Sequence, residues 1–506
     1  MKRIFLVISI LIAVLFVYTV VVVQYISYSS LLSIFPSGII VIAIGILTGL
    51  ISVVITLKIL FKQTYAYKKS HWILLMLMNP IIGITLYTIF ARDFRAKKLA
   101  RTRPLIARKE FLKYEEPTEP HLDQGDIGSI FKYIRSTTQR AVYQDDTFVE
   151  VLNNGDQFFP KLIEQLKKAQ SYIMMEFYII KTDVTGRLVL DVLKAKAQAG
   201  IDVYLLYDHF GSNKHINKAY MKTLIDSGVK MVIFDPQNIN MFGSNVNFRN
   251  HRKATIIDGN VGFVGGMNLA DEYNHLSKKF GFWRDTHVMI KGNGVTSIQN
   301  VFVKDWYYVN GEIIDKPLDK SVVEFKGYFS VVESGPDFEV GLIKDIYLKM
   351  INTARHSIKL VTPYLILEPE MMTALKIAVQ SGVKVQILVP GKSDTRTAGF
   401  ASRSYYEALL SYGVEIYEYT DHFVHSKILV MDDRIASVGS VNFDPRSFHL
   451  NFEVTTIFAN PATLDVVSSF HEDLTKSTQI DLETWSKRSV VLKLIQGFIN
   501  LFSPLF

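Results

Sequence analysis

The sequence contains no cysteine, which excludes disulfide bonds, thiol nucleophiles and cysteine-ligated metal sites. It also has no charged residue between Ile4 and Leu57. A water-soluble domain rarely leaves so long a segment without charge, whereas a membrane-spanning segment requires it. We therefore expect the beginning of the chain to lie in a lipid bilayer.

Acidic residues are scarce in the first 115 positions. Fifteen Lys and Arg there face only Asp93, Glu110 and Glu115, a surplus of +12 in a chain whose net charge is +8, so the remaining residues are net acidic at −4. Basic residues beside a membrane are attracted by anionic headgroups. A nucleic-acid enzyme more often carries its basic surplus on the catalytic part. This distribution predicts anionic membrane lipids as partners and no nucleic acid.

Three apolar segments near the amino terminus predict the membrane topology. The segments 4–23 and 39–57 are long enough to span a bilayer, and no small-residue cleavage site marks the first as a signal peptide. The third, 72–90, is interrupted by Asn79 and Pro80, which bend a helix. The positive-inside rule places the basic clusters on both sides of this third segment in the cytoplasm. We therefore favour two spans and a re-entrant or interfacial hairpin over three spans.

The carboxyl-terminal segment 485–506 predicts an amphipathic helix. Its apolar residues recur at helical spacing. A helix docked on the core of the protein and a helix lying on a membrane surface both fit this pattern. The residues concerned are Val491, Leu494, Ile495, Phe498 and Phe502.

An internal repeat organises the middle of the chain. Three pairs of segments correspond: IMMEFYII (173–180) with IKLVTPYLI (358–366), GIDVYLLYD (200–208) with GVKVQILVP (382–390), and NHRKATIIDGNVGFVGGMN (250–268) with VHSKILVMDDRIASVGSVN (424–442). Each copy alternates short β-branched runs with helical periods, which is typical of α/β layering. The sequence thus predicts an α/β fold in which two repeats form a pseudo-twofold unit with a shared cleft, preceded by transmembrane helices.

These observations divide the chain into four predicted parts. They are a membrane anchor at 1–115, a first repeat at 116–325, a second repeat at 326–480 and an amphipathic segment at 481–506.

Each repeat contains the pattern H-x-K-x4-D followed by a glycine-containing turn and an asparagine. The predicted catalytic residues are His251, Lys253 and Asp258 in the first copy and His425, Lys427 and Asp432 in the second. The turns read G-G-x-N and G-S-x-N, and their predicted substrate-binding residues are Asn268, Ser440 and Asn442, which offer neutral hydrogen bonds to phosphate oxygens.

This residue set fits displacement at a phosphodiester without a metal or another cofactor. Two lysines balance the negative charge that accumulates in the transition state. One histidine attacks phosphorus, and the other protonates the leaving alkoxide and later deprotonates the incoming alcohol. A metal site is disfavoured because a lysine two residues after each histidine repels a cation. Asp258 and Asp432 end strands, so we expect them to support the following loops rather than to react.

A histidine in such a role needs a partner on its second ring nitrogen. The candidates are Asp285, which lies 34 residues after His251, and Glu453, which lies 28 residues after His425. This spacing pairs each carboxylate with the histidine of its own repeat.

The duplicated motif resembles the signature of the phospholipase D superfamily, and the wider sequence resembles bacterial cardiolipin synthases. The segments that carry the second resemblance are GGMNLADEY (265–273), WRDTHVMIKG (283–292), TPYLI (362–366), GSVNFDPRSFHLNFE (439–453) and the final LFSPLF. The resemblance implies transfer of a phosphatidyl group from one phosphatidylglycerol to another, with release of glycerol. It also implies a multi-pass protein of the bacterial cell membrane whose catalytic part faces the cytoplasm.

Within the superfamily the histidine of the first motif is usually the nucleophile. The resemblance therefore assigns nucleophilic attack to His251 and general acid–base chemistry to His425, although the sequence itself is symmetric in this respect. Two alternatives stay open. The same residues would serve a hydrolytic phospholipase D or nuclease, and an inert membrane scaffold would retain the fold but lose the chemistry.

Overall fold

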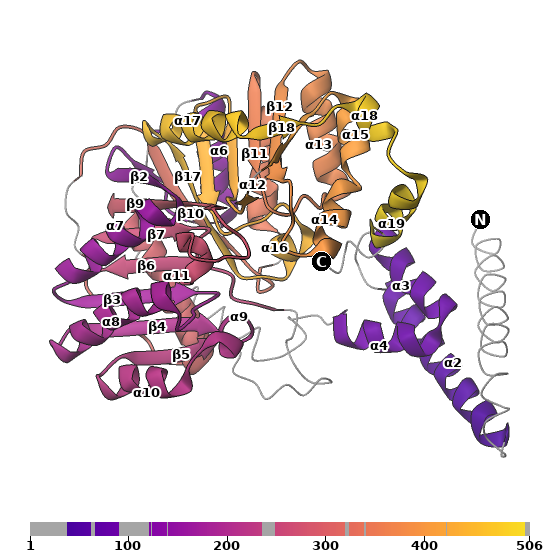
Figure 1. The fold of residues 1–506 in the computed structure, drawn as a ribbon, viewed down its shortest axis with the longest axis horizontal. Helices are drawn as coiled ribbons and strands as arrows, with labels where there is room; N and C mark the ends of the chain where they lie inside the picture. The colour runs from indigo at the N-terminus through magenta and orange to yellow at the C-terminus, as the bar shows by residue number, and fades with distance from the viewer. Residues whose placement is uncertain are drawn as a thin grey trace. The chain divides into compact units, whose positions relative to one another are not determined.

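A computed structural model describes residues 38–61, 66–90, 121–122, 124–138, 140–234, 248–318, 323–338, 341–420 and 422–500. These residues belong to two compact units, drawn in Figure 1. The smaller unit contains the helices before residue 93, and the larger unit contains the described residues from 121 onward. All the predicted site residues lie in the larger unit.

The smaller unit is a set of packed helices, α2 (Gly38–Phe61), α3 (Ala66–Met78) and α4 (Pro80–Phe90). Asn79 separates the last two and caps α4, because its Oδ1 accepts hydrogen bonds from the backbone N–H groups of Ile81 and Ile82 at 3.1 Å. A Cβ added at Gly83 would lie 2.8 Å from the Cα of Met76. Two residues seven positions apart in one straight helix are about 10 Å apart, so the chain folds back sharply here.

The three segments predicted to be membrane-associated differ in how far the structure describes them. The first predicted span, 4–23, lies outside the described residues. The second, 39–57, falls within α2, whose side chains are described from residue 45 onward. The break predicted at Asn79 and Pro80 is confirmed, since 72–90 forms two helices that pack against each other. Where side chains are described, no helix combines the length and the apolar character that crossing a bilayer requires.

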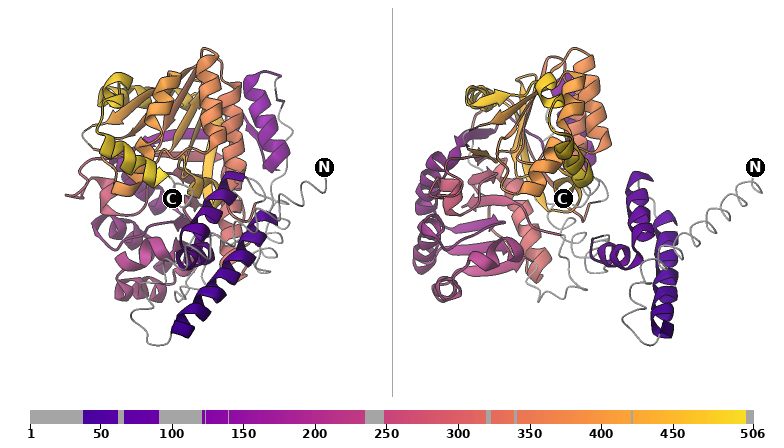
Figure 2. Two further views of the ribbon diagram at one scale, coloured as in Figure 1. Left: turned by 90° about the vertical axis from the view of Figure 1, so that its right-hand side faces the viewer. Right: turned by 45° about the vertical axis from the view of Figure 1, so that its right-hand side comes forward.

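The larger unit is built on two sheets that Figures 1 and 2 show side by side. In order across the first sheet, the strands are β2 (Thr147–Asn153), β9 (Thr286–Gly292), β7 (Val261–Gly265), β6 (Lys253–Ile257), β3 (Tyr172–Phe177), β4 (Asp202–Asp208) and β5 (Lys230–Phe234). In order across the second, they are β1 (Tyr143–Gln144), β10 (Tyr328–Ser334), β17 (Glu453–Ala459), β16 (Ile435–Gly439), β15 (Ile428–Met431), β11 (Ser357–Val361), β12 (Lys384–Pro390), β13 (Glu415–Tyr419) and β18 (Ser477–Gln479).

The strand order confirms the predicted repeat. β2-β9-β7-β6-β3-β4-β5 corresponds, position by position, to β10-β17-β16-β15-β11-β12-β13. The three consecutive strands at one end of each series pair in parallel, and the others pair antiparallel. The turn glycines Gly200 and Gly382, which precede β4 and β12, have φ values of 88° and 91°. Both repeats thus use the same left-handed turn, which favours glycine.

The helices cover the sheets in the order that α/β layering requires. In the first repeat they are α7 (Asn154–Lys168), α8 (Val184–Gln198), α9 (His209–Ser212), η3 (Asn213–His215), α10 (Lys218–Asp226), η4 (Asp271–Asn274) and α11 (Val295–Asn310). In the second they are α12 (Leu342–Thr353), α13 (Pro369–Gln380), α14 (Arg396–Arg403), α15 (Tyr406–Tyr412), α16 (Pro445–His449) and α17 (Ala462–Thr475), followed by α18 (Leu482–Ser486) and α19 (Val490–Asn500).

The buried apolar residues form three clusters that reflect this layering. One lies between β-sheet and helices in the first repeat and includes α7 and α8. The corresponding cluster in the second repeat includes α12 and α13. The third joins the facing sides of both sheets with α11 and α17. Successive strand residues contribute to different clusters, as Phe263 and Val264 do, because side chains alternate across a strand.

One part of the chain differs from the predicted boundary at residue 116. Helix α6 (Asp126–Thr138) packs on α12, and β1 pairs with β10, so both belong to the second sheet rather than to the first repeat. The apolar face of α6, which includes Phe131 and Ile134, is buried in the cluster of the second repeat. Sequence order gave no indication of this crossing, because the partners of α6 lie about 200 residues further along the chain.

Candidate active site

His251 lies two residues before the start of the central strand β6 and is held by the second repeat. Its backbone N–H donates a hydrogen bond to the carbonyl oxygen of Phe452 at 2.9 Å. Its Nδ1 lies 2.9 Å and 3.0 Å from the two carboxylate oxygens of Glu453, the first residue of β17. The Tyr178 ring meets the imidazole edge-on, with ring centroids 4.9 Å apart. We call this group the His251 centre.

His425 lies between the short strand β14 (Phe423–Val424) and β15, and it is held by the first repeat. Its backbone N–H donates to the carbonyl oxygen of Arg284 at 2.7 Å, and its Nδ1 lies 2.7 Å from Asp285 Oδ2. The rings of Tyr273 and Trp283, also from the first repeat, lie 5.8 Å and 5.3 Å from the imidazole between centroids. We call this group the His425 centre.

The pairing of histidines with carboxylates is therefore crossed between the repeats. The expectation that each carboxylate serves the histidine of its own repeat is wrong. The physical reason is that β14 pairs in parallel with β8 (Trp283–Arg284), and Asn250 forms a bridge with Phe452. These two backbone links place each histidine beside the carboxylate-bearing segment of the opposite repeat.

Both histidines are neutral imidazoles at neutral pH. Burial, with smaller contributions from neighbouring lysines, lowers the pKa of His251 and of His425 to about 4, although the carboxylates oppose this effect. Burial alone would raise the pKa of Glu453 and of Asp285, but the adjacent histidine and lysine groups bring both pKa values below their usual range. The Nδ1–H of each neutral ring therefore donates to a carboxylate, which leaves the Nε2 lone pair for a substrate.

The two lysines are buried beside the histidines. Lys253 and Lys427 each donate a hydrogen bond from Nζ to the carbonyl oxygen of the histidine two residues earlier. Burial, with a smaller contribution from the charge of Lys427, lowers the pKa of Lys253 to about 7, and burial lowers the pKa of Lys427 to about 8. Each lysine also lowers the pKa of the histidine in the other repeat. A bound phosphate would favour both ammonium groups by supplying the missing anion.

The described residues contain no group of three or more His, Asp or Glu side chains placed to hold a metal ion.

The small residues of the two turns lie against the carboxylates. A Cβ added at Gly266 would be 2.1 Å from Asp285 Oδ1, so no larger residue fits there. At the corresponding position the hydroxyl of Ser440 donates a hydrogen bond to Glu453. Ser440 therefore contacts a carboxylate in this structure, and a contact with substrate stays a prediction.

The two asparagines of the turns have different surroundings. Asn268 accepts a hydrogen bond at Oδ1 from the backbone N–H of Ile179 at 3.0 Å and donates from Nδ2 to the Tyr273 hydroxyl at 2.6 Å. Asn442 is buried, and its Oδ1 has no hydrogen-bond partner among the described residues. Of the two asparagines, Asn442 is therefore the better candidate for binding a substrate.

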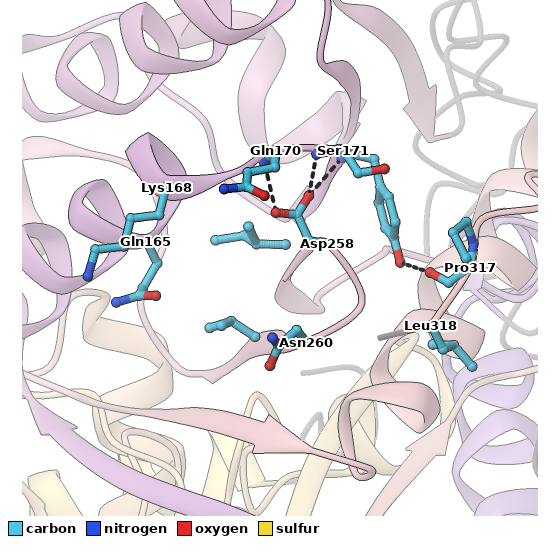
Figure 3. Close-up of a pocket in the computed structure, with 11 residues that line it drawn as sticks. Gln165, Lys168, Gln170, Ser171, Asp258, Asn260, Pro317 and Leu318 are labelled. Carbon is cyan, nitrogen blue, oxygen red and sulfur yellow. Dashed lines mark hydrogen bonds between the residues drawn. The ribbon is translucent and has the colours of Figure 1, made fainter. Parts of the chain in front are cut away.

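Asp258 and Asp432 support the turns that follow their strands. The carboxylate of Asp258 accepts hydrogen bonds from the backbone N–H groups of residues 170, 171 and 172 at 2.8–2.9 Å, as Figure 3 shows in part. Asp432 accepts equivalent bonds from residues 355, 356 and 357. Asp258 lies five residues beyond Lys253 along β6, roughly 16 Å away. It borders a separate cavity of 490 Å³ next to Pro317 and Leu318.

Two buried arginine–aspartate pairs were not predicted from the sequence. Arg252 of the His251 centre donates to Asp305 on α11, and its Nε donates to the carbonyl oxygen of Glu453 at 3.1 Å. Arg284 of the His425 centre donates from Nε to both carboxylate oxygens of Asp473 on α17, at 2.8 and 2.9 Å. Both arginines are almost fully buried. A sequence signal existed, since both aspartates lie 20 residues after the carboxylate that contacts a histidine.

Comparison with known proteins agrees with this fold. The crystal structure of the phosphatidylserine synthase of Haemophilus influenzae Rd KW20 superposes with a TM-score of 0.56 over 74% of this chain and 97% of that one, at 14% sequence identity. At that level of identity the match concerns the fold. A two-repeat α/β fold in which each repeat holds the histidine of the other is the class to which this protein belongs.

The family follows from sequence. A profile described as cardiolipin synthase, PLD-like domain matches residues 162–306 and 347–476, more than half of the chain. A cardiolipin synthase of Geobacillus sp. (strain WCH70) is 37% identical over 91% of this chain and 95% of its own length. Cardiolipin synthase 2 of Bacillus anthracis is 37% identical over 88% of each chain. The chain belongs to the cardiolipin synthase family of phospholipase D-like enzymes, and the resemblance found in the sequence is confirmed.

Proposed function

We propose that this protein makes cardiolipin by transferring a phosphatidyl group between two phosphatidylglycerol molecules. The observation that carries the proposal is the crossed pairing of two neutral histidines with carboxylates from opposite repeats. Each imidazole is held at Nδ1 by the opposite repeat, which leaves two Nε2 lone pairs, with a buried lysine two residues after each histidine, to act on one phosphodiester. A chain of this family with that arrangement is suited to in-line displacement at phosphorus, which requires groups on opposite sides.

In the first half-reaction, Nε2 of His251 forms a bond to the phosphorus of the first phosphatidylglycerol. The bond between phosphorus and the glycerol oxygen breaks, and the electron pair leaves with that oxygen. His425 supplies the proton, and glycerol departs. The anionic substrate favours the protonated form of His425 because a nearby negative charge raises the pKa of an imidazole. Lys253 and Lys427 balance the negative charge that the phosphoryl oxygens carry during the displacement.

In the second half-reaction, a hydroxyl of the second phosphatidylglycerol occupies the place of the departed glycerol. His425, now neutral, takes the hydroxyl proton, and the alkoxide oxygen forms its bond to phosphorus. The bond between phosphorus and His251 breaks, which returns the imidazole to its starting state. Glu453 and Asp285 keep their Nδ1 hydrogen bonds throughout and stabilise whichever ring carries positive charge.

The proposed substrates are membrane lipids, so they imply both the partners and the location of the enzyme. Phosphatidylglycerol and other anionic lipids are its partners, and nucleic acid is not. The apolar segments before residue 93 anchor the chain in the bacterial cell membrane, with more than one pass and with the catalytic part on the cytoplasmic side, where the basic residues of 1–115 face anionic headgroups.

The test is product analysis with liposomes of defined composition. The full-length protein in liposomes containing phosphatidylglycerol should form cardiolipin and release one glycerol per cardiolipin. His251→Ala and His425→Ala should each lose both products, whereas a variant at the exposed Leu276 should keep them. Release of phosphatidic acid instead of cardiolipin would show that water is the acceptor, and activity that persists in both histidine variants would refute the mechanism.

A further inference from the structure

Helix α19 packs on the larger unit through polar side chains. Gln496 is 4% exposed, and its Oε1 accepts a hydrogen bond from Arg488 Nε at 3.1 Å. The Tyr405 hydroxyl donates to Asn500 Oδ1 at 3.2 Å. Lys493 Nζ lies 3.5 Å from a carboxylate oxygen of Glu407 on α15. The inward face of this helix is therefore its polar face.

The outward face of α19 is apolar. Val490, Val491, Leu494 and Phe498 are 71, 63, 68 and 62% exposed, and the spacing of 490, 494 and 498 places them on one side of the helix. A surface helix of a soluble protein shows the reverse arrangement. Of the residues of α19, all of them described, Gln496 is the one that is buried. Of the positions that defined the predicted amphipathic helix, Val491, Leu494, Ile495 and Phe498 are exposed rather than docked on the core, and Phe502 lies outside the described residues.

We propose that the apolar face of α19 lies in the interface of a lipid bilayer. The proposal rests on the proposed function, because an enzyme whose substrate is a phospholipid works at a bilayer surface. Lys493, the single charged residue of α19, is held toward Glu407, so the exposed face carries no charge. The sequence continues for six more residues, LFSPLF, without a charge. Interfacial helices combine such an apolar face with a polar face kept out of the lipid.

A second copy of the chain is a poorer occupant of this face. An eleven-residue helix is about 16 Å long and about 10 Å wide, so one side of it offers on the order of 300 Å². A stable interface between proteins buries about 800 Å² on each partner. A bilayer, in contrast, accepts a small apolar face, because other parts of an anchored enzyme hold it at the membrane.

The absence of cysteine makes a site-specific test direct. Leu494→Cys in the full-length protein, labelled with an environment-sensitive fluorophore and reconstituted in vesicles of phosphatidylcholine and phosphatidylglycerol, should show blue-shifted emission. Lipids that carry a quencher in the acyl chain should quench it severalfold more strongly than aqueous iodide does. The matched control is Lys487→Cys, an exposed polar position just before the helix, which should respond mainly to iodide.

Two outcomes would overturn the proposal. A Leu494 label that iodide quenches as well as it quenches the control would show that the face is in water. A label that neither quencher reaches would show that protein covers it, either a second copy or the amino-terminal helices. The measurement needs no turnover, so it decides this proposal even if no cardiolipin forms.

Activity gives a second readout of the same proposal. Leu494→Glu should raise the apparent KM for phosphatidylglycerol in vesicles about tenfold and leave kcat unchanged, since α19 contributes no group to either histidine centre. Activity on short-chain phosphatidylglycerol dispersed in detergent should equal that of the wild type, which also shows that the variant folds. An unchanged KM in vesicles would contradict the proposal.

Discussion

The His251 centre and the His425 centre share one plan but differ in where their buried cation comes from. In the His251 centre the guanidinium comes from Arg252, within the H-x-K motif, and the residue before the carboxylate is Phe452. In the His425 centre the motif has Ser426 at that position, and the guanidinium comes from Arg284, the residue before the carboxylate. The arginine thus comes from the motif segment in one centre and from the segment of the carboxylate in the other.

The acidic partner of the arginine is the same in both centres, an aspartate on a helix. Asp305 in α11 and Asp473 in α17 each lie 20 residues after the carboxylate that contacts a histidine, and each pairs with the arginine of its own centre. Both centres therefore hold a buried guanidinium between the aspartate of a helix and the segment that carries the histidine. The arginine can come from the histidine segment itself or from the segment that carries the carboxylate. The turns also differ in residue while each contacts the carboxylate of its centre. Gly266 makes room for Asp285, and Ser440 donates a hydrogen bond to Glu453.

The largest expected effect comes from removing the charge of a histidine partner. Glu453→Gln and Asp285→Asn keep the size of the side chain, and each should lower kcat by about 10²–10⁴-fold, the contribution of a positioned acid or base. The carboxylates also raise the histidine pKa values. Glu453→Gln should therefore lower the pKa of His251 alone, and Asp285→Asn that of His425 alone. Each pKa can be measured by modifying the histidines with diethyl pyrocarbonate at a series of pH values and quantifying the modification of each by mass spectrometry. The crossed pairing would be contradicted if Glu453→Gln changed the pKa of His425 and Asp285→Asn that of His251.

The pH dependence compares the two lysines. Below the pKa of about 7 to 8 both are cationic and bind phosphate, so kcat/KM should fall as the pH rises through this range. It should also fall as the pH drops through about 4, where protonation of His251 removes the lone pair that attacks phosphorus. In Lys427→Met the alkaline limb should move to higher pH, because removal of a neighbouring cation raises the pKa of Lys253. An alkaline limb that stays in place would show that Lys253 does not set it.

The different origin of the arginine in the two centres can be tested by measuring the free energy of unfolding of variants. Arg284→Phe leaves the Asp473 carboxylate buried without its partner and should lower the free energy of unfolding by about 3–5 kcal/mol. Adding Ser426→Arg rebuilds the arrangement of the His251 centre, so the double variant should recover part of the loss. Chemical denaturation of the two variants measures this. A double variant less stable than Arg284→Phe would show that the centres are not interchangeable.

The smallest expected effect concerns the turn serine. Ser440→Ala removes one hydrogen bond to the charged Glu453, worth about 1.5–3 kcal/mol, and should lower kcat/KM by roughly ten- to a hundredfold through poorer orientation of His251. Ser440→Thr keeps the hydroxyl and should be closer to the wild type in steady-state kinetics. Equal losses in both variants would point to packing rather than to the hydrogen bond.

The sequence predicted the repeat, the α/β layering and the two histidine–lysine motifs because each depends on local periodicity and spacing. The support of the turns by Asp258 and Asp432 was also predicted, and their backbone hydrogen bonds agree with it. The crossed partners, the placement of α6 on the second sheet and the arginine pairs were not. The first two depend on how segments far apart in the sequence meet in space, and no local pattern shows that. The arginine pairs were missed although both aspartates stand 20 residues after the carboxylate that contacts a histidine.

The most direct test of two histidines acting on one phosphorus is a pre-steady-state burst. A phosphatidyl ester with p-nitrophenol as leaving group needs little protonation to depart. His425→Ala should therefore release one equivalent of nitrophenolate and stop with a phosphatidyl group on His251, while His251→Ala should give no burst. A burst in both variants, a burst in neither, or a covalent adduct on any residue other than these two histidines would contradict the account.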